Sequence, residues 1–122
     1  MDYELNWTCG PLILAETIRE GLDCVVALLQ DDEYADSANV LEEAIQGIAA
    51  IEGALYPQLP DKSRDSMSAY SLELHHAVAA AQSYFASGHW ELLEQLCRDC
   101  LLPRYETWLN ELYRLLARHC YC

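Results

Sequence analysis

Soft metal ligands lie in two short groups near the end of the chain. Two cysteines stand at the two-residue spacing common in zinc sites, within CRDCLLPRYETW at residues 97–108, and the sequence ends in HCYC. The candidate metal ligands are Cys97, Cys100, His119, Cys120 and Cys122. In one continuous helix, about 30 Å would separate the two groups, at about 1.5 Å per residue. The alternative is that the cysteines act as small hydrophobic side chains in a core.

One further pattern could hold a metal, and none could supply a nucleophile. Glu73 and His76 have the Glu-x-x-His spacing of di-iron helical bundles, but a second copy is missing and the apolar face of the segment points elsewhere. A Gly-x-Ser-x-Gly turn and a glycine-rich phosphate loop are both absent from the sequence. We therefore predict a protein that is not an enzyme and that uses no cofactor.

Aromatic side chains with a polar atom are numerous. The chain has 8 Tyr and 3 Trp against 1 Phe, and Tyr and Trp are enriched at protein interfaces. Core packing accounts for many of them, and a partner-binding groove or a homodimer face is the alternative. The candidate partner-binding residues are Tyr105, Trp108, Tyr113 and Trp90.

Helical periodicity organises the chain that carries these residues. Apolar residues recur at alternating steps of three and four, which is typical of amphipathic helices. The predicted breaks are Gly10-Pro11, the acidic stretch QDDEYADS, Pro57 with Pro60, and Ser87-Gly88, and Asp31 or Asp32 is expected to cap the second helix. The predicted helices cover about 11–30, 33–55, 63–86 and 89–118. Short connections favour antiparallel neighbours, so we predict an all-α, antiparallel up-down four-helix bundle that forms one domain over residues 1–122.

The last predicted helix contains an irregularity. Its apolar positions run from Cys97 to Leu101 to Tyr105 in two successive steps of four, which is a stutter in a heptad pattern. Pro103 lies in the same turn, and proline bends or breaks a helix. Both signals predict a kink in the last helix.

Composition limits the classes of partner. The formal charge is −13, and residues 1–65 hold 14 acidic against 3 basic residues. Nucleic acids and anionic membranes require clustered Lys and Arg, so both are disfavoured as partners. The start MDYELNW does not resemble a signal peptide, and the apolar runs are too short to span a membrane, so we expect a cytoplasmic protein.

The order of these segments resembles a known group of small helical proteins. The helix LAETIREGLDCVVALL, the acidic stretch DDEYADSANVLEEAIQGIAAI and the segment HWELLEQLCRDCLLPRYETW are similar in layout to bacterial bundles of the flagellin-export-chaperone type. The resemblance implies a non-enzymatic protein that holds an amphipathic helix of a partner in a groove. It supplies no functional residue for this chain.

The sequence thus predicts a chaperone-like or other protein-interaction bundle. Its expected partner is a protein, either basic or carrying an amphipathic helix, and a homodimer is also compatible. Two alternatives stay open: a metal-binding bundle that uses the Cys and His residues above, and an acidic decoy that occupies a basic, nucleic-acid-binding site on another protein.

Overall fold

The chain folds into helices. The computed structural model describes the backbone of residues 2–117 and the side chains of residues 13–117. The long helices are α1 (Asp2–Gln30), α2 (Tyr34–Leu55), α3 (Asp61–Ser87) and α5 (Leu102–Leu116). Shorter elements are the 3-10 turn η1 (Tyr56–Gln58), helix α4 (Trp90–Leu96) and the π-helical turn η2 (Cys97–Leu101). The described residues contain no strand, so the all-α prediction is confirmed.

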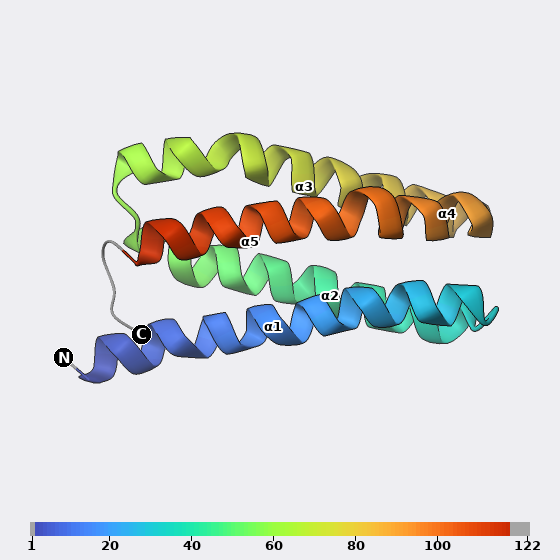
Figure 1. Cartoon of the computed structure of the whole chain (residues 1–122), viewed down its shortest axis with the longest axis horizontal. Coiled ribbons are helices and arrows are strands. Elements are labelled where there is room, and N and C mark those ends of the chain that lie inside the picture. The colour runs from blue at the N-terminus through green and yellow to red at the C-terminus, as the bar shows by residue number, and fades with distance from the viewer. Residues whose placement is uncertain (1, 118–122) are drawn as a thin grey trace.

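The helices lie side by side along the length of the molecule (Figure 1). Helix α1 packs closely on α2, and α3 packs on α4, η2 and α5. These two pairs meet where α1 contacts α4, η2 and α5. The backbones of α2 and α3, in contrast, do not come close over any long stretch, which leaves a seam between them. Within the described part of the chain, no helix has the length and apolar character that a membrane crossing needs.

The predicted apolar seams form the core. In α1 and α2, the residues that recur at helical spacing are almost fully removed from solvent, as are their counterparts in the second half of the chain. They include Ala15, Ile18, Leu22, Val25, Leu29, Leu41, Ala44, Ile48, Ile51, Leu55, Met67, Leu74, Ala77, Ala81, Leu93, Cys97, Leu101, Leu112 and Leu115. Burial of apolar surface at about 25 cal/mol per Å² makes this core the main source of stability.

Helix α1 starts earlier than predicted. It begins at Asp2, whereas the sequence predicted a start near residue 11, at Gly10-Pro11. An interior proline removes one backbone hydrogen bond and disfavours helix on its N-terminal side, yet α1 continues through Pro11, so this residue does not mark the start of the helix. Helix α2 also begins without the predicted aspartate cap. Its N-cap residue is Glu33, which makes no side-chain cap hydrogen bond, while Asp32 adopts a left-handed conformation at φ 60°.

The predicted irregularity in the last helix has a structural counterpart in η2. The backbone N–H of Leu102 donates to the carbonyl of Cys97, five residues back, instead of four as in an α-helix. The π-helical turn therefore lies at the predicted stutter and immediately before Pro103, which occupies the first turn of α5. π-helical turns are frequent at functional sites, and both they and proline are known causes of helix kinks. The bend itself stays a prediction.

Gly47 lets α1 and α2 approach closely. A Cβ atom added there would lie 2.6 Å from Cδ1 and 2.8 Å from Cγ1 of Ile18, which is shorter than van der Waals contact. Gly53 is different, because an added Cβ would meet nothing within 4 Å. Of these two glycines, only Gly47 lies at a close approach between helices.

Candidate binding groove between α2 and α3

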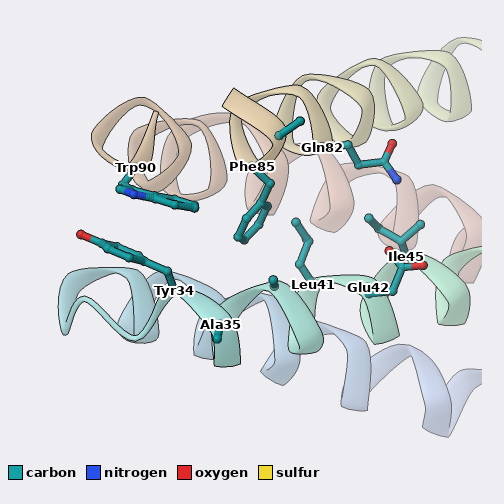
Figure 2. A pocket seen from close by; sticks show the side chains of 10 residues that line it. Tyr34, Ala35, Leu41, Glu42, Ile45, Gln82, Phe85 and Trp90 are labelled. Carbon is teal, nitrogen blue, oxygen red and sulfur yellow. The ribbon is translucent and has the colours of Figure 1, made fainter. Parts of the chain in front are cut away.

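The seam between α2 and α3 is hollowed into an apolar groove of about 490 Å³. From α2, Leu41 and Ile45 line it, and from α3, Phe85 points into it (Figure 2). Its full lining is Tyr34, Ala35, Ala38, Leu41, Glu42, Ile45, Gln82, Phe85, Ala86 and Trp90. We call this the apolar groove. Over residues 34–45, α2 advances about 17 Å, which is about three helical turns.

Side-chain contacts close the seam beyond the Ile45 end of the groove. Nε2 of His75 lies 2.9 Å from both carboxylate oxygens of Glu52, which joins α3 to α2. One turn farther, the hydroxyls of Tyr56 and Ser71 are hydrogen-bonded to each other. The indole N–H of Trp108 donates to the same Tyr56 hydroxyl at 2.7 Å. These bonds connect η1, α3 and α5, so the seam is open only nearer the Tyr34 end.

Two stacked aromatic rings close the other end. Tyr34 and Trp90 have ring centroids 4.3 Å apart and planes inclined by 8°, and Phe85 meets Trp90 edge-on at 5.8 Å. The turns before each helix place these rings. Asp32 accepts a 2.9 Å hydrogen bond from the Tyr34 hydroxyl, and Gly88, at φ 71°, ends α3 in the left-handed conformation that glycine tolerates best. The chain can then begin α4 with Trp90 facing Tyr34.

A second hollow of about 250 Å³ shares the stacked rings with the apolar groove. Its lining is Leu29, Gln30, Asp32, Tyr34, Trp90, Glu91 and Glu94, and we call it the acidic hollow. Hydrogen bonding to Asp32 raises the pKa of Tyr34, and burial and the Glu91 carboxylate act in the same direction. The Tyr34 hydroxyl therefore stays protonated as a donor in an anionic setting.

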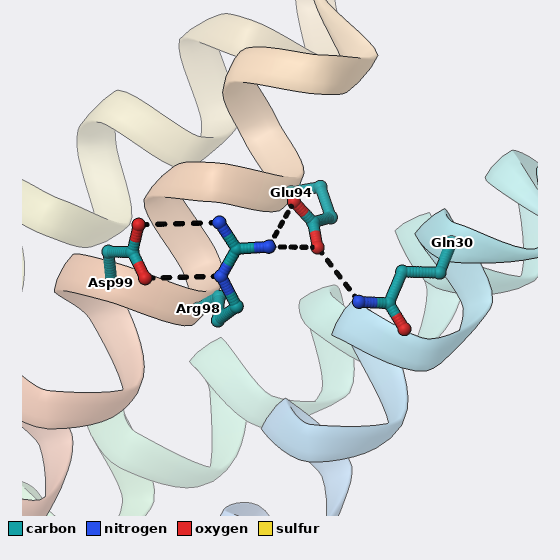
Figure 3. A network of polar contacts seen from close by, with 4 residues as sticks. All are labelled: Gln30, Glu94, Arg98 and Asp99. Carbon is teal, nitrogen blue, oxygen red and sulfur yellow. Dashed lines mark hydrogen bonds and ion pairs between the residues drawn. The ribbon is translucent and has the colours of Figure 1, made fainter.

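One carboxylate of the acidic hollow is already paired (Figure 3). Arg98 donates to Glu94 at 2.7 Å and to the neighbouring Asp99 at 3.1 Å, and Gln30 of α1 donates to Glu94 at 2.9 Å. This network ties the end of α1 to α4 and η2. It leaves Asp32 and Glu91 without an ion pair among the residues that the structure describes.

Two of the predicted partner-binding residues are part of the core. Tyr105 and Trp108 have no exposed surface. The Tyr105 hydroxyl donates to the carbonyl of Ala15 at 2.7 Å, so α5 is attached to α1 there, and burial raises the pKa of Tyr105. Each ring thus has an internal partner for its polar atom and is not accessible at the surface.

The other two predicted residues are half-buried. The Tyr113 hydroxyl donates to Glu16 at 2.9 Å, and burial together with this bond raises the pKa of Tyr113 to about 12. Trp90 lines both hollows. Partner binding stays a prediction for this set, and Trp90 is the member that the structure places at a groove.

The proposed metal ligands are only partly described. Cys97 is buried in η2 and Cys100 is half-buried in the same turn, while His119, Cys120 and Cys122 lie outside the described residues. Burial, aided by the Glu94 charge, raises the pKa of Cys97 to about 12, which disfavours the thiolate that binds metal. Across the described side chains, no three His, Cys, Asp or Glu residues converge as ligands. Glu73 and His76 are both exposed, as their place on the helix predicted.

Sequence reasoning missed most of the groove. Tyr34, Ala38, Leu41 and Phe85 stand at or beside the apolar positions of their helices, but only Leu41 is fully buried. A signal was available, because Tyr34 and the Phe85–Trp90 pair each flank a helix break. Aromatic residues at two adjacent helix ends can meet across a bundle.

The fold and the groove define a class: a small all-α protein with an apolar interhelical groove and an acidic end. Residues 13–111 match the family described as a domain of unknown function, DUF8042, and the chain belongs to that family. The match includes both hollows, η2 and most of α5. No curated protein and no solved structure matches the chain.

Proposed function

We propose that this protein is a non-catalytic interaction module, a chaperone-like antiparallel up-down bundle whose apolar groove holds an amphipathic helix of a protein partner. The observation that carries the proposal is the seam between α2 and α3. It is closed at one end by the Glu52–His75 and Tyr56–Ser71 contacts and at the other by the Tyr34–Trp90 stack, and it is apolar between them.

The dimensions and chemistry of the groove suit a helix. Three turns of partner helix match the about 17 Å between Tyr34 and Ile45, and apolar residues at i, i+4 and i+7 would follow its floor. Nearly all of the lining is apolar or aromatic, with Glu42 and Gln82 as the polar members. The π-helical turn before Pro103 supports a bent last helix in this bundle, which is part of the proposal.

The acidic-decoy alternative is less well supported. Its support is the net charge alone, whereas the apolar groove is a defined hollow with two polar side chains in its lining, Glu42 and Gln82. We therefore favour the groove over a charged surface as the site of interaction.

Two matched substitutions test the groove. The probe is a designed three-turn peptide with Leu at i, i+4 and i+7 and Gln or Ala elsewhere, capped at both termini. Ile45→Glu introduces a charge into the groove, and Ile13→Glu makes the same exchange at an exposed site on α1. We expect the wild type and Ile13→Glu to bind the peptide, as measured by calorimetry, and Ile45→Glu to lose binding.

The wild type also offers a readout that needs no substitution. Bound peptide should shift the NMR signals of the Phe85 ring and the Trp90 indole and leave those of Trp108 unchanged, which covers the case in which Ile45→Glu fails to fold. Absence of binding to the wild type, or equal binding to the two variants when both are folded, would overturn the proposal.

A further inference from the structure

The apolar groove and the acidic hollow are neighbours that differ in chemistry. They share Tyr34 and Trp90, so the stacked rings form the wall between them. Leu41, Ile45 and Phe85 lie on the groove side of these rings (Figure 2). Asp32, Glu91 and Glu94 line the acidic hollow. A ligand that follows the groove toward Tyr34 therefore leaves an apolar surface and reaches an anionic one.

Two of the three carboxylates of the acidic hollow, Asp32 and Glu91, have no ion pair among the described residues, whereas Glu94 is paired with Arg98. Of the side chains that the structure describes, no Lys or Arg lines either hollow. The Arg98 guanidinium, which contacts the hollow's Glu94, is shared between Glu94 and Asp99. Asp32 accepts a hydrogen bond from the Tyr34 hydroxyl, and Glu91 lies in the first turn of α4. Two carboxylates beside aromatic rings form a suitable environment for an ammonium or guanidinium group.

We infer that the occupant of the apolar groove is an amphipathic helix with a Lys or Arg at one end, seated beside the Tyr34–Trp90 stack and paired with Asp32 and Glu91. This inference rests on the function proposed above, and it adds the charge of the partner beside the Tyr34–Trp90 stack. The cation lies about eleven residues from the apolar side chain that fills the Ile45 end, because about 17 Å of helix separates the two positions.

Two peptides and two double variants test the charge. The peptides share the Leu stripe described above and differ in carrying Lys or Gln at both ends. Asp32→Asn with Glu91→Gln removes the two charges, and Asn tolerates the left-handed conformation at position 32. Glu20→Gln with Asp23→Asn makes the same net change at exposed sites on α1 and serves as the control.

We expect the Lys peptide to bind the wild type and the control about two- to thirty-fold more tightly than the Gln peptide, as two exposed ion pairs allow. In the Asp32→Asn, Glu91→Gln variant the two peptides should bind equally, and high salt should reduce the difference in the wild type.

The outcomes separate this inference from the proposed function. If the Gln peptide binds the wild type as tightly as the Lys peptide does, the inference about charge is wrong, but the proposed function of the apolar groove is still supported. If the Lys preference persists in the Asp32→Asn, Glu91→Gln variant, the attraction comes from overall charge and the inference is again wrong. If neither peptide binds, the proposed function itself fails.

Discussion

Replacing Gly47 by Ala tests how closely α1 and α2 must pack. The added Cβ would stand 2.6 Å from Cδ1 of Ile18 and 2.8 Å from its Cγ1. Ile18 is only 4% exposed and is β-branched, so its side chain has little freedom to move away. Overpacking of this kind costs about 1–3 kcal/mol, while exchange of Gly for Ala in a helix gains up to about 1 kcal/mol.

Gly53→Ala is the matched control. It lies in the same helix and its added Cβ meets nothing within 4 Å, so only the propensity gain applies. The difference in unfolding free energy between the two variants therefore isolates the overpacking, and we expect Gly53→Ala to be more stable than Gly47→Ala by about 1–3 kcal/mol. Urea unfolding followed by far-UV circular dichroism measures both.

A double substitution identifies the clash. Ile18→Val removes Cδ1, the closest atom, and alone should cost about 0.5–1.5 kcal/mol. Combined with Gly47→Ala, it should restore part of the lost stability, so the two effects should not add. Equal stability of Gly47→Ala and Gly53→Ala, or strict additivity in the double variant, would refute the reasoning.

The remaining predictions concern buried polar groups. Tyr56→Phe leaves the indole N–H of Trp108 without its acceptor, and urea unfolding should show a loss of about 1–3 kcal/mol in unfolding free energy. Tyr113→Phe should lose less than about 1 kcal/mol, because its partner Glu16 is exposed. Equal losses in the two variants would contradict the assigned bonds. Cys97 should resist alkylation in the native protein while the exposed Cys24 reacts, as peptide mass mapping would show, and fast labelling of Cys97 would count against its burial. Burial raises the pKa of Cys97 from 9.0 to about 12, so between these pH values the folded state keeps a proton that the unfolded state loses. The unfolding free energy should therefore fall as the pH rises through this range, by up to about 1.4 kcal/mol per pH unit. The fall should be less steep in Cys97→Ala.

Much of the core could be predicted because it depends on local periodicity. The spacing of Ile18, Leu22 and Val25 marks one face of a helix whatever that helix packs against, and all three are buried. The stutter around Leu101 predicted a kink in the last helix; the structure has the π-helical turn η2 at this place, and the kink itself stays a prediction. Helix starts were harder, since Gly10-Pro11 and Asp32 are local signals that the observed helices do not obey.

The roles of the aromatic residues could not be predicted in the same way. Composition marked Tyr105 and Trp108 as interface candidates, but each polar atom finds an internal acceptor contributed by a distant segment, Ala15 and Tyr56 respectively. Tyr34 and Phe85 looked like ordinary seam residues, although they border the groove. The local difference between the two pairs is that Tyr34 and Phe85 lie beside helix breaks, and this position does not by itself show which segment each ring will meet.

By itself, the sequence determined the helical class, the faces that are buried and the acidic charge, because these follow from residue type and spacing within one element. The tertiary structure alone decided that α1 and α2 pack tightly through Gly47 while α2 and α3 stand apart. It also brought Tyr34 against Trp90 across 56 positions of sequence. A groove is lined by residues of two helices, and its width depends on how the remaining helices pack. The sequence of one helix does not determine either.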